Sequence, residues 1–201
     1  MEYIKLMRMK HYIKNMLIFL PLFFSKNILD IKLLINTIIG FIVFSILTSI
    51  VYIFNDILDV EQDKKHPQKS NRPIASGKIS IKKAYIFLSI LALVDILIAI
   101  FALKLSILGS IFALGYLVMN LCYSTKLKRV PILDVTIISL GFLIRLLFGS
   151  AVTGIEVSNL LYLTVLAVSF YLGLGKRRNE LIKIEDSARE VLKRIYKELS
   201  R

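Results

Sequence analysis

The sequence predicts an all-α, polytopic integral membrane protein, and three observations support this fold class. Of the 201 residues, 56% are hydrophobic and the mean hydropathy is +0.70, whereas soluble domains are about 45–50% apolar. A core of this size cannot bury so many apolar side chains, but lipid can solvate the outer faces of helices. The apolar residues form long runs, and the 27 lysines and arginines lie mainly between alternate runs. This spacing excludes a soluble nucleic-acid-binding protein, and the single cysteine, Cys122, excludes an intrachain disulfide.

Six apolar runs are candidates for crossing a bilayer, which takes about 20 residues of helix. They cover residues 15–29, 33–54, 84–103, 105–123, 131–152 and 159–175. The first run is short and contains Pro21, so a signal peptide is an alternative, but no A-x-A cleavage pattern follows it. The sequence therefore predicts six transmembrane helices.

The basic residues predict the orientation of these helices. Of the 27, 23 lie before the first run, between the second and third, between the fourth and fifth, or after the sixth. The opposite loops contain only Lys26, Lys32 and Lys104. Because cytoplasmic loops are enriched in lysine and arginine, we expect an inner-membrane protein with both termini in the cytoplasm. The net charge of +13 is thus in part a topology signal.

A carboxylate cluster follows the second run, where Asn55 precedes Asp56, Asp59 and Asp63. If the helix continues, at about 100° per residue the three carboxylates lie within about 60° of one another on one face. Such crowded carboxylates repel one another unless a cation lies among them, and Mg²⁺ binds one or two carboxylates together with water and phosphate oxygens. The sequence therefore predicts a Mg²⁺ site at Asp56, Asp59 and Asp63, with Asn55 as a neutral oxygen donor.

The loop after the cluster supplies cations. One interpretation is a solvated helix end whose acids pair with Lys64 and Lys65. We favour a functional site because the cluster borders the membrane and leads directly to Lys69 and Arg72. A metal ion with fixed cations beside it is what a diphosphate group requires.

Arg145 lies inside the fifth run, on the same helical face as Asp134. The two are about 16 Å apart along a helix axis, so they do not pair directly. An arginine at membrane depth faces a cavity or a partner. We expect Arg145 to reach into a polar cavity toward an anionic substrate, with Asp134 lining the same cavity. An ion pair between Arg145 and Asp95 of the third run is the structural alternative.

Two further polar clusters lie at the ends of runs. Tyr123 and Lys126 follow the fourth run, and Lys176 and Arg177 follow the sixth. Tyrosine and lysine are common anchors at the membrane interface, and a basic cluster is commonly a topology signal or an anionic-lipid contact. Each cluster therefore has a structural interpretation beside a substrate-binding one.

These motifs resemble those of the UbiA superfamily of intramembrane prenyltransferases, through N-D-x-x-D-x-x-x-D at residues 55–63. The chain is most similar to the decaprenyl-phosphate phosphoribosyltransferase branch, over about residues 8–196. The stretches that carry this similarity are K-H-Y-I-K-N (10–15), H-P-Q-K-S-N-R-P-I-A-S-G (66–77), Y-S-T-K-L-K-R-V-P-I-L-D-V (123–135), G-F-L-I-R (141–145) and G-K-R-R-N-E (175–180).

The resemblance implies a Mg²⁺-dependent transferase with a cavity open to the cytoplasm and to lipid. Mg²⁺ at the three aspartates would hold the diphosphate of phosphoribosyl diphosphate, and a polyprenyl phosphate would attack the anomeric carbon. The catalytic residues implied are Asp56, Asp59, Asp63 and Arg145. The substrate-binding residues implied are Lys14, Asn55, Lys69, Arg72, Tyr123, Lys126, Asp134, Lys176 and Arg177.

Members of this family have about nine membrane helices, so the resemblance implies one domain, residues 1–201, that is incomplete at its C-terminus. Its last part, 176–201, is expected to be a cytoplasmic basic segment. A second D-x-x-x-D, which prenyltransferases with aromatic acceptors carry after the sixth helix, is replaced here by K-R-R-N-E. Two alternatives stay open: prenyl transfer from a prenyl diphosphate, and an inactive membrane remnant. A homo-oligomer or a completing partner chain is compatible with either.

Overall fold

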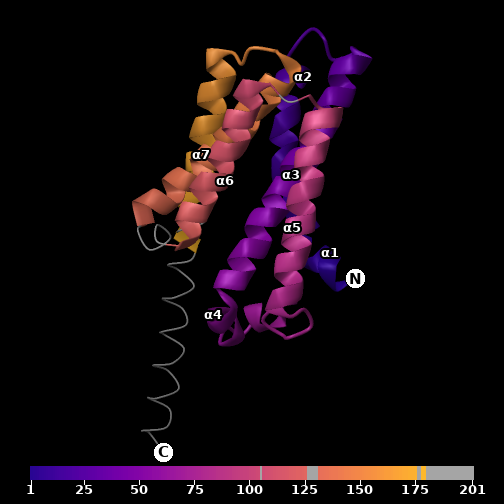
Figure 1. Ribbon diagram of the computed structural model, residues 1–201. Helices are drawn as coiled ribbons and strands as arrows, with labels where there is room; N and C mark the ends of the chain where they lie inside the picture. The colour runs from indigo at the N-terminus through magenta and orange to yellow at the C-terminus, as the bar shows by residue number, and fades with distance from the viewer. Residues whose placement is uncertain (105, 126–130, 176–177, 180–201) are drawn as a thin grey trace, which may run out of the picture.

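The computed structural model (Figure 1) describes residues 1–104, 106–125, 131–175 and 178–179, and in these residues every regular element is a helix. In chain order the elements are α1 (Glu2–Met7), the 3₁₀ helix η1 (Met9–Phe19), α2 (Leu20–Phe23), α3 (Ile31–Leu58), α4 (Val60–Lys64), the 3₁₀ turn η2 (Lys69–Asn71), α5 (Ile81–Leu97), the π-helical η3 (Ile98–Ala102), α6 (Ile107–Thr125) and α7 (Pro131–Thr153). A shorter apolar helix, Asn159–Gly175, follows α7. The predicted all-α fold class is confirmed.

Four of these helices are long and apolar enough to span a membrane, namely Ile31–Leu58, Ile81–Ala102, Ile107–Ser124 and Val135–Thr153. Each lies within a few residues of a predicted run, and Asn159–Gly175 coincides with the sixth. The protein is therefore an integral membrane protein, with the second to fifth predicted spans in the predicted order and a shorter apolar helix at the sixth.

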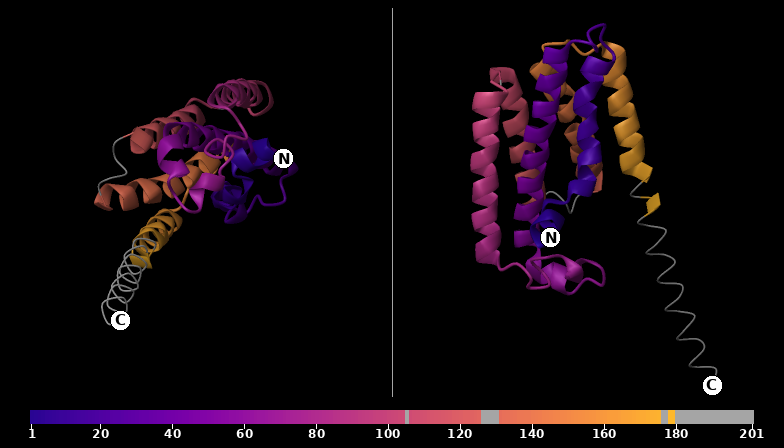
Figure 2. Two further views of the ribbon diagram at one scale, coloured as in Figure 1. Left: turned by 90° about the horizontal axis from the view of Figure 1, so that it is seen from below. Right: turned by 90° about the vertical axis from the view of Figure 1, so that its right-hand side faces the viewer.

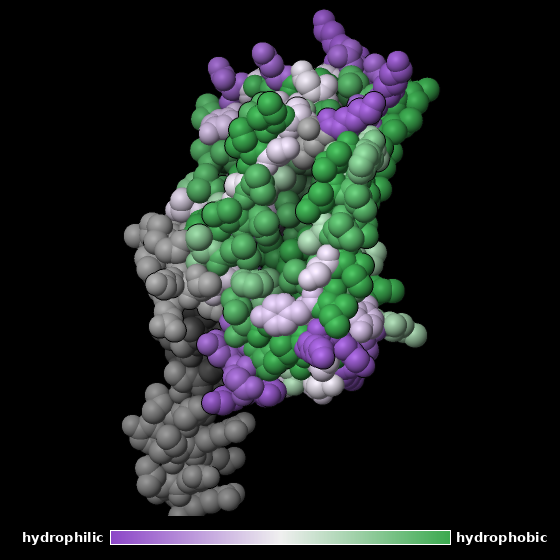
Figure 3. All heavy atoms as spheres, viewed as in Figure 1, coloured by the Kyte–Doolittle hydropathy of each residue, from purple (hydrophilic) through white to green (hydrophobic). Residues whose placement is uncertain are grey.

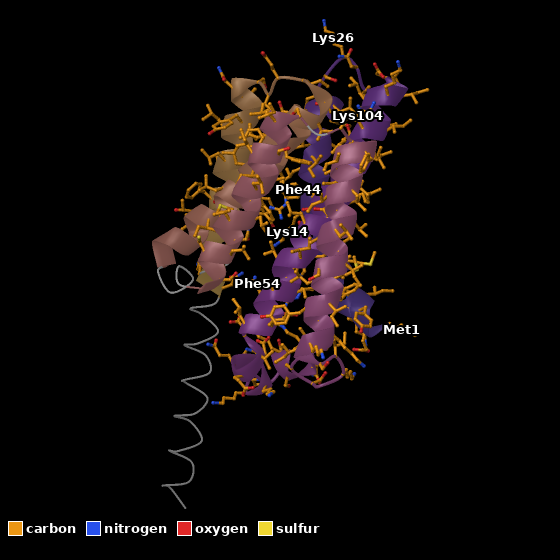
Figure 4. All side chains as sticks on the ribbon, viewed as in Figure 1. Met1, Lys14, Lys26, Phe44, Phe54 and Lys104 are labelled. Atoms are coloured by element: carbon orange, nitrogen blue, oxygen red, sulfur yellow. The ribbon has the colours of Figure 1, made fainter. Side chains whose placement is uncertain are left out.

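The two ends of the bundle differ in the segments that they carry. In Figure 1 successive helices run in alternate directions, so that α1 and α4 lie at one end and α2 lies at the other. Figure 4 places Lys26 and Lys104 at the end opposite Met1, and in Figure 3 a hydrophobic band separates two hydrophilic ends. We call these the Met1 end and the Lys26 end. The alternation of loops predicted from charge is confirmed; that the Met1 end is cytoplasmic stays a prediction.

The first span is not the predicted one. Residues 15–29 were expected to form it, but the helical segment comprises η1 and α2 and ends before Ser25. There the Ser25 hydroxyl donates to the carbonyl of Leu22 (2.8 Å) and accepts the N–H of Asn27 (3.1 Å), which makes a turn. Asp30 then caps α3. A 3₁₀ helix rises about 2.0 Å per residue, so the 15 residues of η1 and α2 extend about 28 Å, close to the bilayer core.

The 3₁₀ geometry gives η1 a period of three residues, so every third side chain lies on the same face. Tyr12, Asn15 and Ile18 form the face toward the bundle. The hydroxyl of Tyr12 hydrogen-bonds that of Ser49 (2.7 Å), and the amide of Asn15 donates to the hydroxyl of Ser45 (3.0 Å). Ile18 is fully buried. The next face carries His11, Lys14 and Leu17, and the third exposes Ile13 and Met16.

Helix α3 is the centre of the bundle and contacts η1, α5, α6 and α7. In the most apolar 18-residue stretch of α3, 61% of the residues are buried, whereas in that of the helix Ile81–Ala102 only 11% are buried. Figure 2 shows α3 between α5 and the remaining helices. Its Phe44 ring packs against Tyr116 of α6 (4.8 Å between centroids) and Phe148 of α7 (5.0 Å). This aromatic contact joins three helices at mid-depth.

Gly149 of α7 is the point of closest approach to η1. A Cβ at this position would lie 2.2 Å from the backbone oxygen of Ile18, well inside any allowed contact. Only a residue without a side chain therefore lets η1 pack between α3 and α7.

Replacing this glycine is expected to loosen the first span. Gly149→Ala forces the backbone of η1 away from α7, and overpacking of this kind costs about 1–3 kcal/mol. Thermal unfolding of the purified protein in detergent should report a lower midpoint. Gly115→Ala is the matched control, because a Cβ at Gly115 meets nothing within 4 Å. Equal midpoints for the two variants would contradict the packing described here.

Candidate functional site

Two buried carboxylates at the Met1 end are neutralised by two arginines from distant parts of the chain. Arg72 Nη1 lies 2.5 Å from Asp63 Oδ2 and 3.2 Å from Asp56 Oδ1, so one guanidinium bridges both carboxylates. Arg8 forms a second ion pair with Asp56 Oδ1. The side chains of Asp56 and Asp63 are only 2% and 4% exposed, whereas those of Arg8 and Arg72 are 21% and 25% exposed. We call Arg8, Asp56, Asp63 and Arg72 the acid–arginine cluster.

The third predicted carboxylate, Asp59, lies between the helices that carry Asp56 and Asp63. Within the described parts of the chain, no three histidine, cysteine, aspartate or glutamate side chains lie close enough together to hold a metal ion. The carbonyl of Asp59 accepts the N–H of Asp63 (2.8 Å), and its own N–H donates to the carbonyl of Asn55 (2.9 Å), so helical hydrogen bonding continues past Asp59. That Asp59 shares a metal site with Asp56 and Asp63 stays a prediction.

The solvated-helix interpretation applies to one neighbouring acid. Glu61 is exposed and pairs with Lys64 one turn later, at 2.7 Å. This hydrogen bond lowers the pKa of the Glu61 carboxyl. Asp56 and Asp63 differ from Glu61 in being buried and paired with arginines rather than lysines.

The loop that carries Arg72 is fixed to the helical core. Ile74 and Ile79 are buried in the same apolar cluster as Leu6 of α1 and Ile53 of α3. Because these isoleucines follow Arg72 closely, their burial holds the guanidinium over the end of α3. Lys69 begins η2 and is exposed.

Asn55 adds an unusual polar group beside the cluster. Its Oδ1 atom is buried and has no hydrogen-bond partner within the described structure. A buried acceptor without a donor is costly, so this oxygen is available to a ligand that brings its own donor or cation.

A second polar centre lies deeper, around Arg145 of α7. Its Nε donates to Asn15 Oδ1 (2.7 Å), its Nη1 to the carbonyl of Gly141 (2.6 Å) and its Nη2 to the hydroxyl of Tyr116 (2.9 Å). The guanidinium also lies 4.8 Å from the Tyr116 ring centroid and 5.4 Å from that of Phe44. Arg145 is 5% exposed, so these bonds offset the cost of burying its charge.

The alternative in which Arg145 pairs with Asp95 is wrong. The hydrogen bonds of Arg145 go to η1, α6 and its own helix, and Asp95 lies on α5. Asp95 Oδ1 is buried and without a hydrogen-bond partner among the residues that the structure describes.

Arg145 lines a cavity of about 110 Å³. The walls combine cationic, phenolic and amide groups, contributed by Lys14, Tyr52, Tyr116, Asn120, Tyr123 and Arg145 among others. In Figure 4, Lys14 and Phe44 lie between the two ends of the bundle. We call this space the Arg145 cavity, and its composition suits an anion.

Tyr52 connects the two polar centres. It lines the Arg145 cavity and lies four residues before Asp56 on α3, which is about 6 Å along the helix axis. The Arg8 guanidinium lies 5.0 Å from the centroid of the Tyr52 ring. The acid–arginine cluster and the Arg145 cavity are thus neighbouring parts of one site.

An apolar groove of about 620 Å³ adjoins the cavity. It runs between η1, α2, α7 and the helix Asn159–Gly175, and its walls include Leu17, Leu20, Val165 and Leu172. Lys14 and Phe142 line both the groove and the Arg145 cavity. Lys14 therefore supplies a cationic group where the apolar groove meets the Arg145 cavity.

The predicted site residues divide into four groups. Asp56, Asp63 and Arg72 meet in the acid–arginine cluster, and Lys14, Tyr123 and Arg145 line the Arg145 cavity. Asn55, Asp59 and Lys69 lie in the same segment of the chain as the acid–arginine cluster. The predictions for Lys126, Lys176, Arg177 and the side chain of Asp134 fall outside the described residues.

The sequence reasoning missed Arg8, Asn15, Tyr52, Tyr116 and Asn120. Two signals pointed to some of them: Asn15 closes the K-H-Y-I-K-N stretch, and Arg8 precedes it. The distance between Arg8 and Asp56 along the chain, 48 residues, hides their contact from any local pattern.

Together the fold and these two centres define a helical membrane protein with a buried acidic site beside a cationic one. The profile of the UbiA prenyltransferase family matches residues 16–190. The chain therefore belongs to the UbiA prenyltransferase family, as the sequence motifs predicted.

Known relatives support this assignment. Decaprenyl-phosphate phosphoribosyltransferase of Corynebacterium glutamicum is 31% identical over 192 residues, covering 94% of this chain and 58% of that protein. The uncharacterized protein y4nM of Sinorhizobium fredii is 35% identical over 182 residues, covering 90% of this chain and 35% of that protein. A UbiA homolog from Archaeoglobus fulgidus bound to DMAPP and Mg²⁺ has the same fold, with a TM-score of 0.68 at 17% identity over 85% of this chain and 60% of that one. The chain thus spans 60% or less of the length of these relatives.

The hydrogen bond between Asn15 and Arg145 is expected to stabilise the whole first span. Asn15→Ala removes the acceptor for Arg145 Nε and the donor to Ser45, and leaving such buried groups unpaired costs about 1–3 kcal/mol. Thermal unfolding in detergent should therefore show a lower midpoint. Asn36→Ala, near the Lys26 end of α3, is the control and should unfold close to the wild-type midpoint. A wild-type midpoint for Asn15→Ala would disprove the anchoring role.

Proposed function

We propose that this site transfers phosphoribosyl from phosphoribosyl diphosphate to a polyprenyl phosphate. The observation that carries the proposal is the arrangement of three neighbouring parts: a buried acid–arginine cluster, a cationic cavity one helical turn deeper, and an apolar groove that meets this cavity at Lys14. The similarity to decaprenyl-phosphate phosphoribosyltransferase of Corynebacterium glutamicum supports it.

The diphosphate of the donor is assigned to the acid–arginine cluster. Asp56 and Asp63 share one guanidinium, so their oxygens are close enough to bind one cation, and carboxylate oxygens are ligands that Mg²⁺ prefers. The free Oδ1 of Asn55 fits the same donor set. Mg²⁺ bound there would neutralise oxygens of the diphosphate and stabilise it as a leaving group. That a UbiA homolog is known bound to DMAPP and Mg²⁺ supports this assignment.

The acceptor lipid is assigned to the Arg145 cavity and the apolar groove. Its phosphate would lie beside Lys14, whose ammonium is at the junction of both spaces, within the positive field of Arg145. Its isoprenoid tail would lie in the groove, where burial of apolar surface favours binding. Tyr123 and Asn120 offer hydrogen bonds to the same phosphate.

In the proposed reaction an oxygen of the lipid phosphate attacks the anomeric carbon of the ribose. The bond from this carbon to the diphosphate oxygen breaks as the new carbon–oxygen bond forms, and the diphosphate leaves with the electron pair. Two anionic substrates must approach each other, so the cations Arg8, Lys14, Arg72 and Arg145 would offset their repulsion. Lys69, Lys126, Asp134, Lys176 and Arg177 remain proposed substrate contacts from the sequence, and Asp59 a proposed metal ligand.

We further propose that the Met1 end faces the cytoplasm, in the inner membrane. Helix α1 and the basic loop before α5 lie at this end, as the positive-inside rule requires. A soluble phosphoribosyl donor would then reach the acid–arginine cluster from the cytoplasm.

A second function has its own support. The UbiA homolog with the same fold is bound to DMAPP, a prenyl diphosphate. If the cluster binds the diphosphate of a prenyl donor instead, an unlabelled prenyl diphosphate will displace labelled phosphoribosyl diphosphate at lower concentration than the unlabelled phosphoribosyl compound. Stronger displacement by phosphoribosyl diphosphate favours the first proposal.

Loss of the buried carboxylate is expected to abolish transfer. With labelled phosphoribosyl diphosphate, polyprenyl phosphate and Mg²⁺, the protein should form a lipid-extractable product, and Asp56→Asn should reduce its rate about 100-fold or more, in the range of lost electrostatic stabilisation. Glu61→Gln removes an exposed carboxylate of the same segment and should keep the rate. Unchanged turnover in Asp56→Asn would overturn the proposal, and absence of both binding and product in the wild type would indicate an inactive remnant.

Lys14→Gln is expected to affect the lipid substrate selectively. Loss of a charge-assisted contact should raise the KM for polyprenyl phosphate about tenfold, while the KM for phosphoribosyl diphosphate changes little. Initial rates at varied concentrations of each substrate give both constants. Lys32→Gln, at the Lys26 end, is the control. A larger rise in the KM for phosphoribosyl diphosphate would place Lys14 in the donor site instead.

A further inference from the structure

We propose that Arg8 and Arg72 are exchangeable counter-ions, which neutralise Asp56 and Asp63 in the free protein and pass to the diphosphate when a metal ion binds the carboxylates. Metal ion and diphosphate would then bind as a coupled pair, each weakly alone. This inference rests on the proposed function, which assigns a Mg²⁺–diphosphate group to the acid–arginine cluster.

The first argument is that arginine and metal compete for the same oxygens. Asp56 Oδ1 accepts from both Arg8 and Arg72, and Asp63 Oδ2 accepts from Arg72. A metal ion that takes these oxygens must displace the guanidinium groups. A metal ion alone therefore exchanges one set of cations for another and gains little.

The second argument concerns what the displaced arginines would contact. Burial of an unpaired charge is costly, and Arg72, whose side chain is 25% exposed, forms ion pairs with Asp56 and Asp63. A diphosphate beside the metal supplies new anionic oxygens, and a guanidinium binds phosphate oxygens in the same forked geometry as carboxylate oxygens. The exchange becomes favourable only when both ligands arrive.

The third argument is that the arginines, and not the carboxylates, are free to move. Asp56 and Asp63 are almost fully buried and lie on helices. Arg8 and Arg72 are 21% and 25% exposed and lie outside regular helix. Arg8 already lies over the Tyr52 ring, which faces the Arg145 cavity. A short side-chain rotation would therefore bring each guanidinium toward the space between the two centres.

This exchange makes a prediction of opposite sign for the two ligands. If Arg72 competes with the metal, Arg72→Gln should bind a metal ion alone more tightly than the wild type does, because the carboxylates have lost a competitor. The same variant should bind diphosphate more weakly, because the displaced cation is missing. Coupling between two binding sites is reciprocal. The factor by which diphosphate changes the affinity for the metal ion must therefore equal the factor by which the metal ion changes the affinity for diphosphate, and Arg72→Gln should reduce both factors equally.

The test uses Mn²⁺ as the metal probe, titrated into the purified full chain in detergent and followed by electron paramagnetic resonance, with and without inorganic diphosphate. For the wild type, diphosphate should lower the Kd for Mn²⁺ by at least about fivefold, within the usual range of coupling between sites. For Arg72→Gln, the Kd for Mn²⁺ alone should fall by at least about threefold, and the effect of diphosphate should shrink toward unity. Lys64→Gln, which removes an exposed cation of the same segment, should behave as the wild type.

Three outcomes separate the hypotheses. Weaker binding of Mn²⁺ alone by Arg72→Gln, or a wild-type Kd that diphosphate leaves unchanged, overturns the exchange but leaves the transferase proposal standing. Failure of the wild type to bind Mn²⁺ even with diphosphate overturns the proposed function itself. If Arg72→Gln does not fold, Arg8→Gln decides: it removes the other arginine that shares Asp56 Oδ1, so Mn²⁺ alone should again bind more tightly than to the wild type.

Discussion

The structure depends on the hydrogen bond between Asn15 and Arg145. In hydrocarbon an arginine must be paired or face a cavity, and here Asn15 accepts from the guanidinium while its own amide donates to α3. One amide therefore links η1, α3 and α7. Because η1 is held in this way, its remaining residues are placed where the chemistry is proposed: Arg8 over the end of α3, and Lys14 at the junction of the cavity and the groove.

The 3₁₀ conformation of η1 directs the residues of the K-H-Y-I-K-N stretch toward different surroundings. With three residues per turn, Tyr12 and Asn15 face α3, Lys14 lines the Arg145 cavity, and Ile13 is exposed. The same conformation lengthens the segment, so that few residues approach the thickness of the bilayer core. Close packing against α7 is possible because Gly149 has no side chain. A polar motif and a glycine thus act together although they are more than 130 residues apart.

Much of the fold followed from the sequence. Hydropathy predicted four spans and the shorter helix Asn159–Gly175 to within a few residues, because solvation by lipid acts on local composition. Charge predicted that Lys26 and Lys104 lie at one end of the bundle, opposite Met1. The first span was predicted too far along the chain, at residues 15–29 instead of 9–23. Hydropathy detects only the apolar part of this segment, whereas the 3₁₀ helix begins among charged residues. The carboxylates were recognised by their spacing, but their pairing with Arg8 and Arg72 was not, because these arginines come from other segments of the chain.

The sequence by itself determined the membrane environment, the order of the helices, the family and the residue types of the candidate site. These properties follow from composition, charge and short motifs, which are local features of the sequence. Only the tertiary structure decided which charges neutralise one another: Asp56 with Arg8 and Arg72, and Arg145 with Asn15 and Tyr116 rather than Asp95. The reason is physical. A buried ionic group requires a partner at hydrogen-bond distance, and which partner reaches it depends on how distant segments pack, which no local pattern records.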